Sequence, residues 1–143
     1  MFQLFEESLE EIVTKKSRPS EDSGAVVTFE GRVRNVNDGK KVLRLEYQSY
    51  QEMAVMEGEQ IISEARHKFP SLNDCYCVHR TGTLEIGDLA VWVICSSRHR
   101  REAFEACQFV IDEVKKRVPI WKNEHYQDGT REWVACHRCQ GKG

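Results

Sequence analysis

The sequence predicts one α+β domain. Two long segments carry apolar residues at helical spacing, and the segments around them have the alternating or continuously apolar character of strands. The 143 residues have the size of one ordinary domain, and no repeat, low-complexity tract or long linker divides them. We therefore expect a single domain over residues 1–143, with the order β-β-α-β-β-α-β after a leading helix and a frayed tail at residues 140–143.

The N-terminal part of the chain predicts a short helix followed by a strand. The helix is indicated by apolar residues at helical spacing, namely Phe5, Leu9, Ile12 and Val13. A polar loop over residues 18–24 comes next. Residues 25–34 then alternate between apolar and polar side chains, as expected of a strand with one buried face.

A hairpin and a long helix follow. The Asn-Asp-Gly run at residues 37–39 has the composition of a tight turn, and it leads to a returning strand over residues 43–48. Residues 51–69 predict an amphipathic helix that Pro70 ends. The apolar side of this helix carries Ala54, Gly58, Ile61, Ile62, Ala65 and Phe69.

Three further strands are predicted in the second half. The first lies around residues 75–81, and residues 82–88 form a glycine-containing connection to the next. Residues 89–95 are almost continuously apolar, which is typical of a central strand covered on both faces. The last strand is expected at residues 132–136.

Between these strands, residues 101–118 predict a second long helix, which Pro119 ends. Its inward side is expected to carry Ala103, Phe104, Cys107, Val110, Ile111 and Val114. The junction before the helix contains His99 and Arg100 among further basic residues. Several cations at a helix N-terminus oppose its dipole and invite an anion such as a phosphate, but solvated surface residues are about as probable from residue chemistry alone.

The overall charge excludes a general nucleic-acid role. The formal net charge is −2, so cationic residues gather only locally, which suits a small anionic ligand. We expect no signal peptide and no membrane-spanning segment, because no apolar run has the necessary length. The six cysteines are then expected to be free thiols of a cytoplasmic protein.

Two lysines and one arginine are further candidates for chemistry. A lysine in an apolar pocket near other cations can serve as a base or nucleophile, which makes Lys115 and Lys122 candidates. On spacing alone, however, Lys115 is better explained by favourable pairing with the negative C-terminal end of the helix. Lys122 is better explained as an ordinary surface residue. Arg34 lies on the same strand face as Arg32, where a solvated sheet face is again the more probable reading.

The C-terminal cysteines raise the question of a metal. Cys136 and Cys139 form a lone Cys-x-x-Cys pair, and a tetrahedral zinc site needs four ligands. We therefore expect neither a metal nor a cofactor. A small zinc-binding interaction protein centred on this pair stays a minor alternative.

Four segments together resemble the large, catalytic subunit of molybdopterin synthase. They are GAVVTFEGRVRN at residues 24–35, HRTGTLEIGD at residues 79–88, SSRHRREAFEACQFVIDEVKKRVPIWK at residues 96–122, and EWV at residues 132–134. The resemblance implies an α/β-hammerhead type of fold. It also implies a sulfurtransferase of molybdenum cofactor biosynthesis that converts cyclic pyranopterin monophosphate to the dithiolene of molybdopterin.

The same resemblance implies the partners and the site. Sulfur comes from the C-terminal Gly-Gly thiocarboxylate of a small ubiquitin-like subunit, and the large subunit forms a homodimer within a heterotetramer. The family's catalytic lysines fall on Lys115 and Lys122, and its substrate-phosphate pocket falls on Arg34, His99 and Arg100. A non-catalytic dimeric module that binds a ubiquitin-like tail or a phosphorylated metabolite is the alternative from another class.

Overall fold

A four-stranded sheet forms the centre of the computed structural model, which describes residues 1–135. Its strands, in spatial order, are β1 (Phe2–Phe5), β5 (Leu72–Arg80), β7 (Leu89–Ser97) and β2 (Ala25–Arg32). β1 runs parallel to β5, and the other two pairs are antiparallel. β7 is buried along its whole length, as its continuously apolar sequence predicts.

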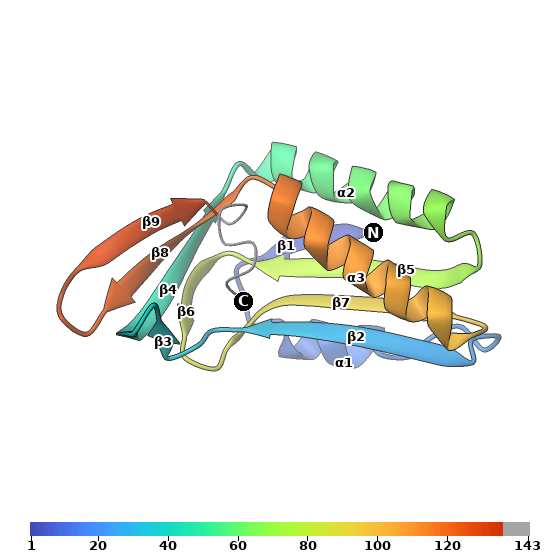
Figure 1. The fold of residues 1–143 in the computed structure, drawn as a ribbon, viewed down its shortest axis with the longest axis horizontal. Coiled ribbons are helices and arrows are strands. Elements are labelled where there is room, and N and C mark those ends of the chain that lie inside the picture. The colour runs from blue at the N-terminus through green and yellow to red at the C-terminus, as the bar shows by residue number, and fades with distance from the viewer. Residues whose placement is uncertain (136–143) are drawn as a thin grey trace.

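Helices cover both faces of this sheet (Figure 1). On one face α2 (Gln51–Lys68) and α3 (Arg100–Arg117) pack against each other, and α1 (Glu10–Lys16) lies on the opposite face. The alternation of side chains along β5 separates the two cores: Cys75 and Cys77 pack with α2 and α3, whereas Tyr76 and Val78 pack with Leu9 and the α1 layer.

A second sheet extends from one end of this body (Figure 1). It is built from β3 (Val36–Asn37), β4 (Lys40–Ser49), β8 (Ile120–Tyr126) and β9 (Arg131–Ala135), in that spatial order, with β6 (Gly82–Glu85) also paired to β4. β4 follows β2 in the chain, and β8 follows α3. The second sheet is therefore joined to the central sheet and to the C-terminal end of α3.

Arg117 fixes the end of α3 against α2. Its guanidinium pairs with Glu57 at 2.7 Å, with Glu64 at 2.8 Å and with Glu113 at 3.2 Å. These bonds raise the pKa of Arg117 above its usual range, with the hydrogen bond to Glu64 as the main cause. The last turn of α3, which carries Lys115, is consequently held in a defined place.

The α+β class and both long helices are confirmed, and the expected inward residues of α2 lie in the core. Within the described residues, no helix has the length and apolar character needed to cross a membrane. Residues 140–143, where a frayed tail is expected, and residue 136 of the last predicted strand lie outside the described part.

The structure differs from the sequence predictions in four places. The chain begins with β1, and the leading helix starts only at Glu10, so Phe5 belongs to a strand that the helical spacing concealed. Residues 82–85 form β6 where a connection is predicted, and residues 120–126 form β8, which was not predicted at all. Phe104 is 61% exposed, because the small residues Ala103 and Ala106 make the close contact of α3.

Candidate active site

A cavity of about 290 Å³ lies where the two sheets meet the C-terminal end of α3. Its walls are largely apolar, with side chains from β2, β4, β7, β8 and α3, and they include Phe29, Leu45, Val91, Val114, Val118 and Ile120. An apolar wall lowers the local dielectric constant, which strengthens any charge interaction inside the cavity.

Three of the five predicted site residues line this cavity. Arg34 follows β2, Lys115 lies in the last turn of α3, and Lys122 lies on β8. Pro119 makes this arrangement possible, because it separates α3 from β8 and lets the two lysines approach the cavity from different elements. The apolar lining and the neighbouring cations are the environment that activates a lysine.

A buried carboxylate holds Lys122. Glu124 is 2% exposed, and its Oε1 atom lies 3.0 Å from Nζ of Lys122. Its other oxygen accepts hydrogen bonds from Asn37 and from the Tyr126 hydroxyl. Burial alone would raise the pKa of Glu124, but these bonds and the Lys122 charge outweigh it and lower the pKa. Glu124 is therefore a buried anion with a complete set of partners.

The same contacts act on Tyr126. Burial and the hydrogen bond to Glu124 raise the pKa of Tyr126 to about 12. The hydroxyl consequently stays protonated as a donor to the carboxylate over the whole physiological pH range.

His79 of β5 also lines the cavity, and its ring contacts that of Tyr47 of β4. The sequence analysis assigned no role to His79 or Glu124. A period-two pattern does not distinguish a polar residue facing a cavity from one facing solvent, so nothing in the spacing identified either residue. His79 begins one of the segments that carry the family resemblance, and that position was the available signal.

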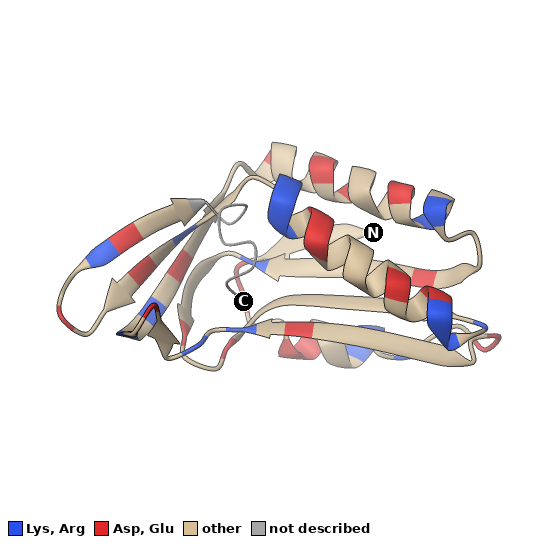
Figure 2. Ribbon diagram, in the orientation of Figure 1, with Lys and Arg blue, Asp and Glu red and all other residues tan. Residues whose placement is uncertain are grey.

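His99 and Arg100 lie elsewhere in the chain. They stand at the N-terminal end of α3, in a separate and more open depression beside Gly24 and Ala25. Between Arg100 and Lys115 the helix rises by roughly 22 Å. Figure 2 shows the two cationic ends of α3 well apart. A single chain therefore does not bring His99 and Arg100 to the cavity that contains Arg34.

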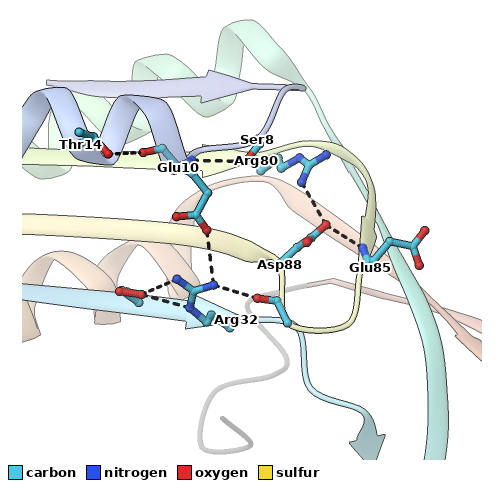
Figure 3. A network of polar contacts seen from close by, with 9 residues as sticks. Ser8, Glu10, Thr14, Arg32, Arg80, Glu85 and Asp88 are labelled. Atoms are coloured by element: carbon cyan, nitrogen blue, oxygen red, sulfur yellow. Dashed lines mark hydrogen bonds and ion pairs between the residues drawn. The ribbon is translucent and has the colours of Figure 1, made fainter.

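Arg32, the neighbour of Arg34 along the predicted strand face, is engaged in a different network (Figure 3). Its guanidinium pairs with Glu30 at 2.8 Å and Glu10 at 3.6 Å, and it donates a hydrogen bond of 2.9 Å to the carbonyl of Gly87. The hydrogen bond to Glu30 is the main reason why its pKa is raised. Arg32 thus ties α1 and the β6–β7 turn to the end of β2.

Within residues 1–135, no group of three or more His, Cys, Asp or Glu side chains is arranged to hold a metal ion. Cys136 and Cys139 lie outside that range. Four cysteines within the described residues are free and buried, and they include Cys95 and Cys107, which were predicted as core residues.

A family model and related sequences point to the same family of proteins. The family model described as MoaE protein matches residues 5–117. A molybdopterin synthase catalytic subunit from Pyrococcus abyssi is 47% identical over 119 residues, which cover 83% of this chain and 79% of the relative. A protein of the same name from Nostoc sp. is 45% identical over 121 residues, covering 85% and 73%.

The fold agrees with a solved relative as well. The crystal structure of molybdopterin synthase from Staphylococcus aureus matches with a TM-score of 0.86 and 36% sequence identity. The match covers 94% of this chain and 96% of that one.

Proposed function

The chain belongs to the family of molybdopterin synthase catalytic subunits, the MoaE proteins, and on this basis we propose that it is a sulfurtransferase. It inserts two sulfurs into cyclic pyranopterin monophosphate, which yields the dithiolene of molybdopterin. Each sulfur comes from the C-terminal thiocarboxylate of a small ubiquitin-like subunit, whose C–S bond is hydrolysed so that the tail is left as a carboxylate. One observation carries the proposal: Arg34, Lys115 and Lys122, which come from three separate parts of the chain, line one cavity.

Each of these residues has a chemical task in the proposed reaction. Arg34 binds the substrate phosphate through charge-assisted hydrogen bonds. Lys115 transfers protons or holds an intermediate while the thiocarboxylate sulfur attacks the side chain of the pterin. Lys122, anchored by Glu124 at 3.0 Å, provides positive charge for the carboxyl end of the partner's tail. The apolar walls strengthen all three interactions.

His99 and Arg100 serve the same phosphate from a second copy of the chain. A small metabolite that contacts Lys115 does not reach the other end of an 18-residue helix. Both residues are exposed at the N-terminal end of α3, where the helix dipole favours an anion. In a two-fold homodimer, this end of one protomer completes the cavity of the other.

Two general features belong to the same proposal. We place residues 1–143 in one domain, since the described elements share continuous cores around the central sheet. We also place the protein in the cytoplasm, because the four cysteines within the described residues are free thiols.

Product formation tests the function directly. The purified chain is combined with the thiocarboxylated small subunit and cyclic pyranopterin monophosphate, and the dithiolene product is measured. Lys115→Ala should lower the rate by at least about 100-fold, because a proton-transfer or covalent group is lost from the cavity. Lys116→Ala is the matched control: this lysine is exposed and pairs with Glu113 at 3.3 Å, so its loss should change the rate by less than about twofold.

Two outcomes would contradict the proposal. Near-normal turnover by Lys115→Ala would remove the catalytic assignment. Tight binding of the small subunit without any product from the wild-type chain would instead indicate a non-catalytic binding module.

A further inference from the structure

His79 is a buried titratable residue of the cavity that the proposed reaction leaves without a task. It is the penultimate residue of β5 and is 7% exposed. The edge of its ring contacts Tyr47, with ring centroids 5.0 Å apart and an angle of 75° between the planes. His79 therefore lies at the seam between the central sheet and the second sheet, on the side where α3 ends.

The hydrogen bonding of His79 fixes its tautomer. Nδ1 lies 2.8 Å from the backbone carbonyl oxygen of Arg80. A carbonyl only accepts hydrogen bonds, so Nδ1 carries the proton and donates it. Burial, together with the positive charge of Lys115, lowers the pKa of His79 to about 4 against the opposing effect of this bond. The ring is consequently neutral at pH 7, and the lone pair of Nε2 can accept a hydrogen bond.

Arg80, whose carbonyl orients the ring, is held in place by its side chain, and Figure 3 shows the contact of its guanidinium with Asp88. The Arg80 side chain donates hydrogen bonds to the carbonyl of Glu6 at 3.1 Å and to Asp88 at 3.2 Å. Asp88 in turn accepts the backbone N–H of Glu85 at 2.9 Å. Because these contacts restrain Arg80 between β1 and the β6–β7 turn, the direction of the His79 ring is set before any substrate binds.

These contacts give His79 more than a packing role. An aliphatic side chain would line an apolar cavity without the cost of burying an imidazole. Lys115 lines the same cavity as His79, and its positive charge contributes to lowering the pKa of His79. A neutral acceptor can bind an ammonium donor without neutralising its charge.

We propose that His79 is a positioning residue for Lys115, with the Nε2 atom of His79 accepting a hydrogen bond from the Lys115 amine during turnover. This role rests on the proposed function, because it assigns Lys115 as the reacting residue. The contact directs the flexible lysine side chain toward the substrate, and correct placement of a reacting group contributes strongly to rate.

Two substitutions of His79 test the roles of Nδ1 and Nε2 separately. The amide of Asn in His79→Asn replaces Nδ1, so the bond to Arg80 is retained and the acceptor is lost. The amide of Gln in His79→Gln lies near the position of Nε2, so an acceptor for Lys115 is restored. We expect kcat of His79→Asn to fall by about 30-fold or more with KM changed by less than about twofold, and His79→Gln to recover most of kcat.

A titration without substrate provides a second readout. The titration of the Lys115 side chain is followed by NMR at its Cε carbon in the wild type and both variants. Loss of the acceptor destabilises the ammonium form, so its midpoint should move to lower pH by about one unit in His79→Asn and return in His79→Gln. The other charged groups lining the cavity are unchanged in every variant, and they are Glu30, Arg32, Arg34, Lys122 and Glu124.

Several results would overturn this role. A rise in KM alone would mean that His79 contacts the substrate. Full kcat in a folded His79→Asn protein, or equal losses of kcat in both variants, would refute the Nε2 contact. An unchanged midpoint of the Lys115 titration in His79→Asn would refute it as well. An inactive wild-type chain whose Lys115 midpoint still responds to His79→Asn would instead refute the proposed function and keep the contact.

Discussion

The charge of Glu124 is buried together with its partners, which explains how a 2% exposed carboxylate is tolerated. Lys122 supplies the opposite charge, and Asn37 and Tyr126 supply hydrogen bonds. These contacts lower the pKa of Glu124 in the folded protein. The carboxylate therefore stabilises the fold fully at pH values above the pKa that Glu124 has in the unfolded chain, and this stabilisation is lost as the pH falls through its pKa in the folded protein. The carboxylate thus fixes Lys122 under neutral conditions.

We expect Glu124→Gln to impair both activity and stability. The neutral amide keeps the shape but leaves Lys122 without its buried counter-charge, so the free energy of unfolding should fall by about 1–3 kcal/mol. The misplaced lysine should lower the rate of product formation by about 10- to 100-fold. Urea unfolding and the product assay measure the two effects.

Glu132→Gln is the control for that substitution. Glu132 lies directly opposite Glu124 in the β8–β9 pairing, but its side chain is exposed. Its change should be nearly neutral in both measurements. Equal losses of activity and stability in the two variants would show that they result from the change in net charge and not from the lost anchoring of Lys122.

Single residues of the site were predictable only in part. Lys115, Lys122 and Arg34 were assigned through the family resemblance, and the structure places all three at one cavity. Their spacing alone favoured ordinary surface positions. His79 and Glu124 escaped notice because the burial of a polar side chain depends on which elements pack above it, and no local pattern reports that.

At the scale of elements, the contact between α2 and β1 depends on Gly58. A Cβ atom at this position would lie 2.2 Å from the ring of Phe2, which is 1% exposed. Only a residue without a side chain allows the helix to approach the first strand this closely. The glycine is thus retained inside a helix despite its low helix propensity.

Gly58→Ala should therefore destabilise the protein, although alanine is favoured in helices by about 1 kcal/mol. Overpacking against Phe2 outweighs that gain, and we expect a net loss of about 1–3 kcal/mol in thermal or urea unfolding. Ser63→Ala, at an exposed position of the same helix, should be neutral or slightly stabilising. In a Phe2→Ala background the cost of Gly58→Ala should largely disappear, and persistence of the full cost there would refute the clash.

The elements that the sequence predicted well are those with a strong period. The helices at residues 51–68 and 100–117 and the strand at residues 89–97 have long, uninterrupted patterns. β8 was missed because polar residues occupy its cavity side, including Lys122 and Glu124. β1 and β6 are four residues each, which is too short for a period to stand out.

At the scale of the whole molecule, two inactive variants should complement each other. If each cavity takes Lys115 from one protomer and His99 from its partner, a mixed dimer of Lys115→Ala and His99→Ala chains has one intact site and one doubly defective site. Half of the dimers are mixed after random exchange, so about a quarter of the wild-type rate should return. The product assay after co-refolding or co-expression measures this recovery.

The control is the double variant, in which both substitutions are on the same chain. Mixed with an equal amount of wild type, it leaves no intact site in a mixed dimer, so only the wild-type homodimers are active. The rate should therefore fall to about a quarter of that of the wild type at the same total concentration, below the half that dilution alone would give. Absence of recovery from the two single variants would mean that His99 does not serve a cavity of the partner.

The span of α3 between Arg100 and Lys115 has a consequence for the evolution of the chain. One rigid rod sets the separation between its two functional ends, so a change in its length disturbs the proposed site more than a change of an exposed side chain does. Exposed positions such as Gln108 and Asp112 are free to drift. A single inserted or deleted residue would instead rotate one end by about 100° relative to the other and misalign both sites at once.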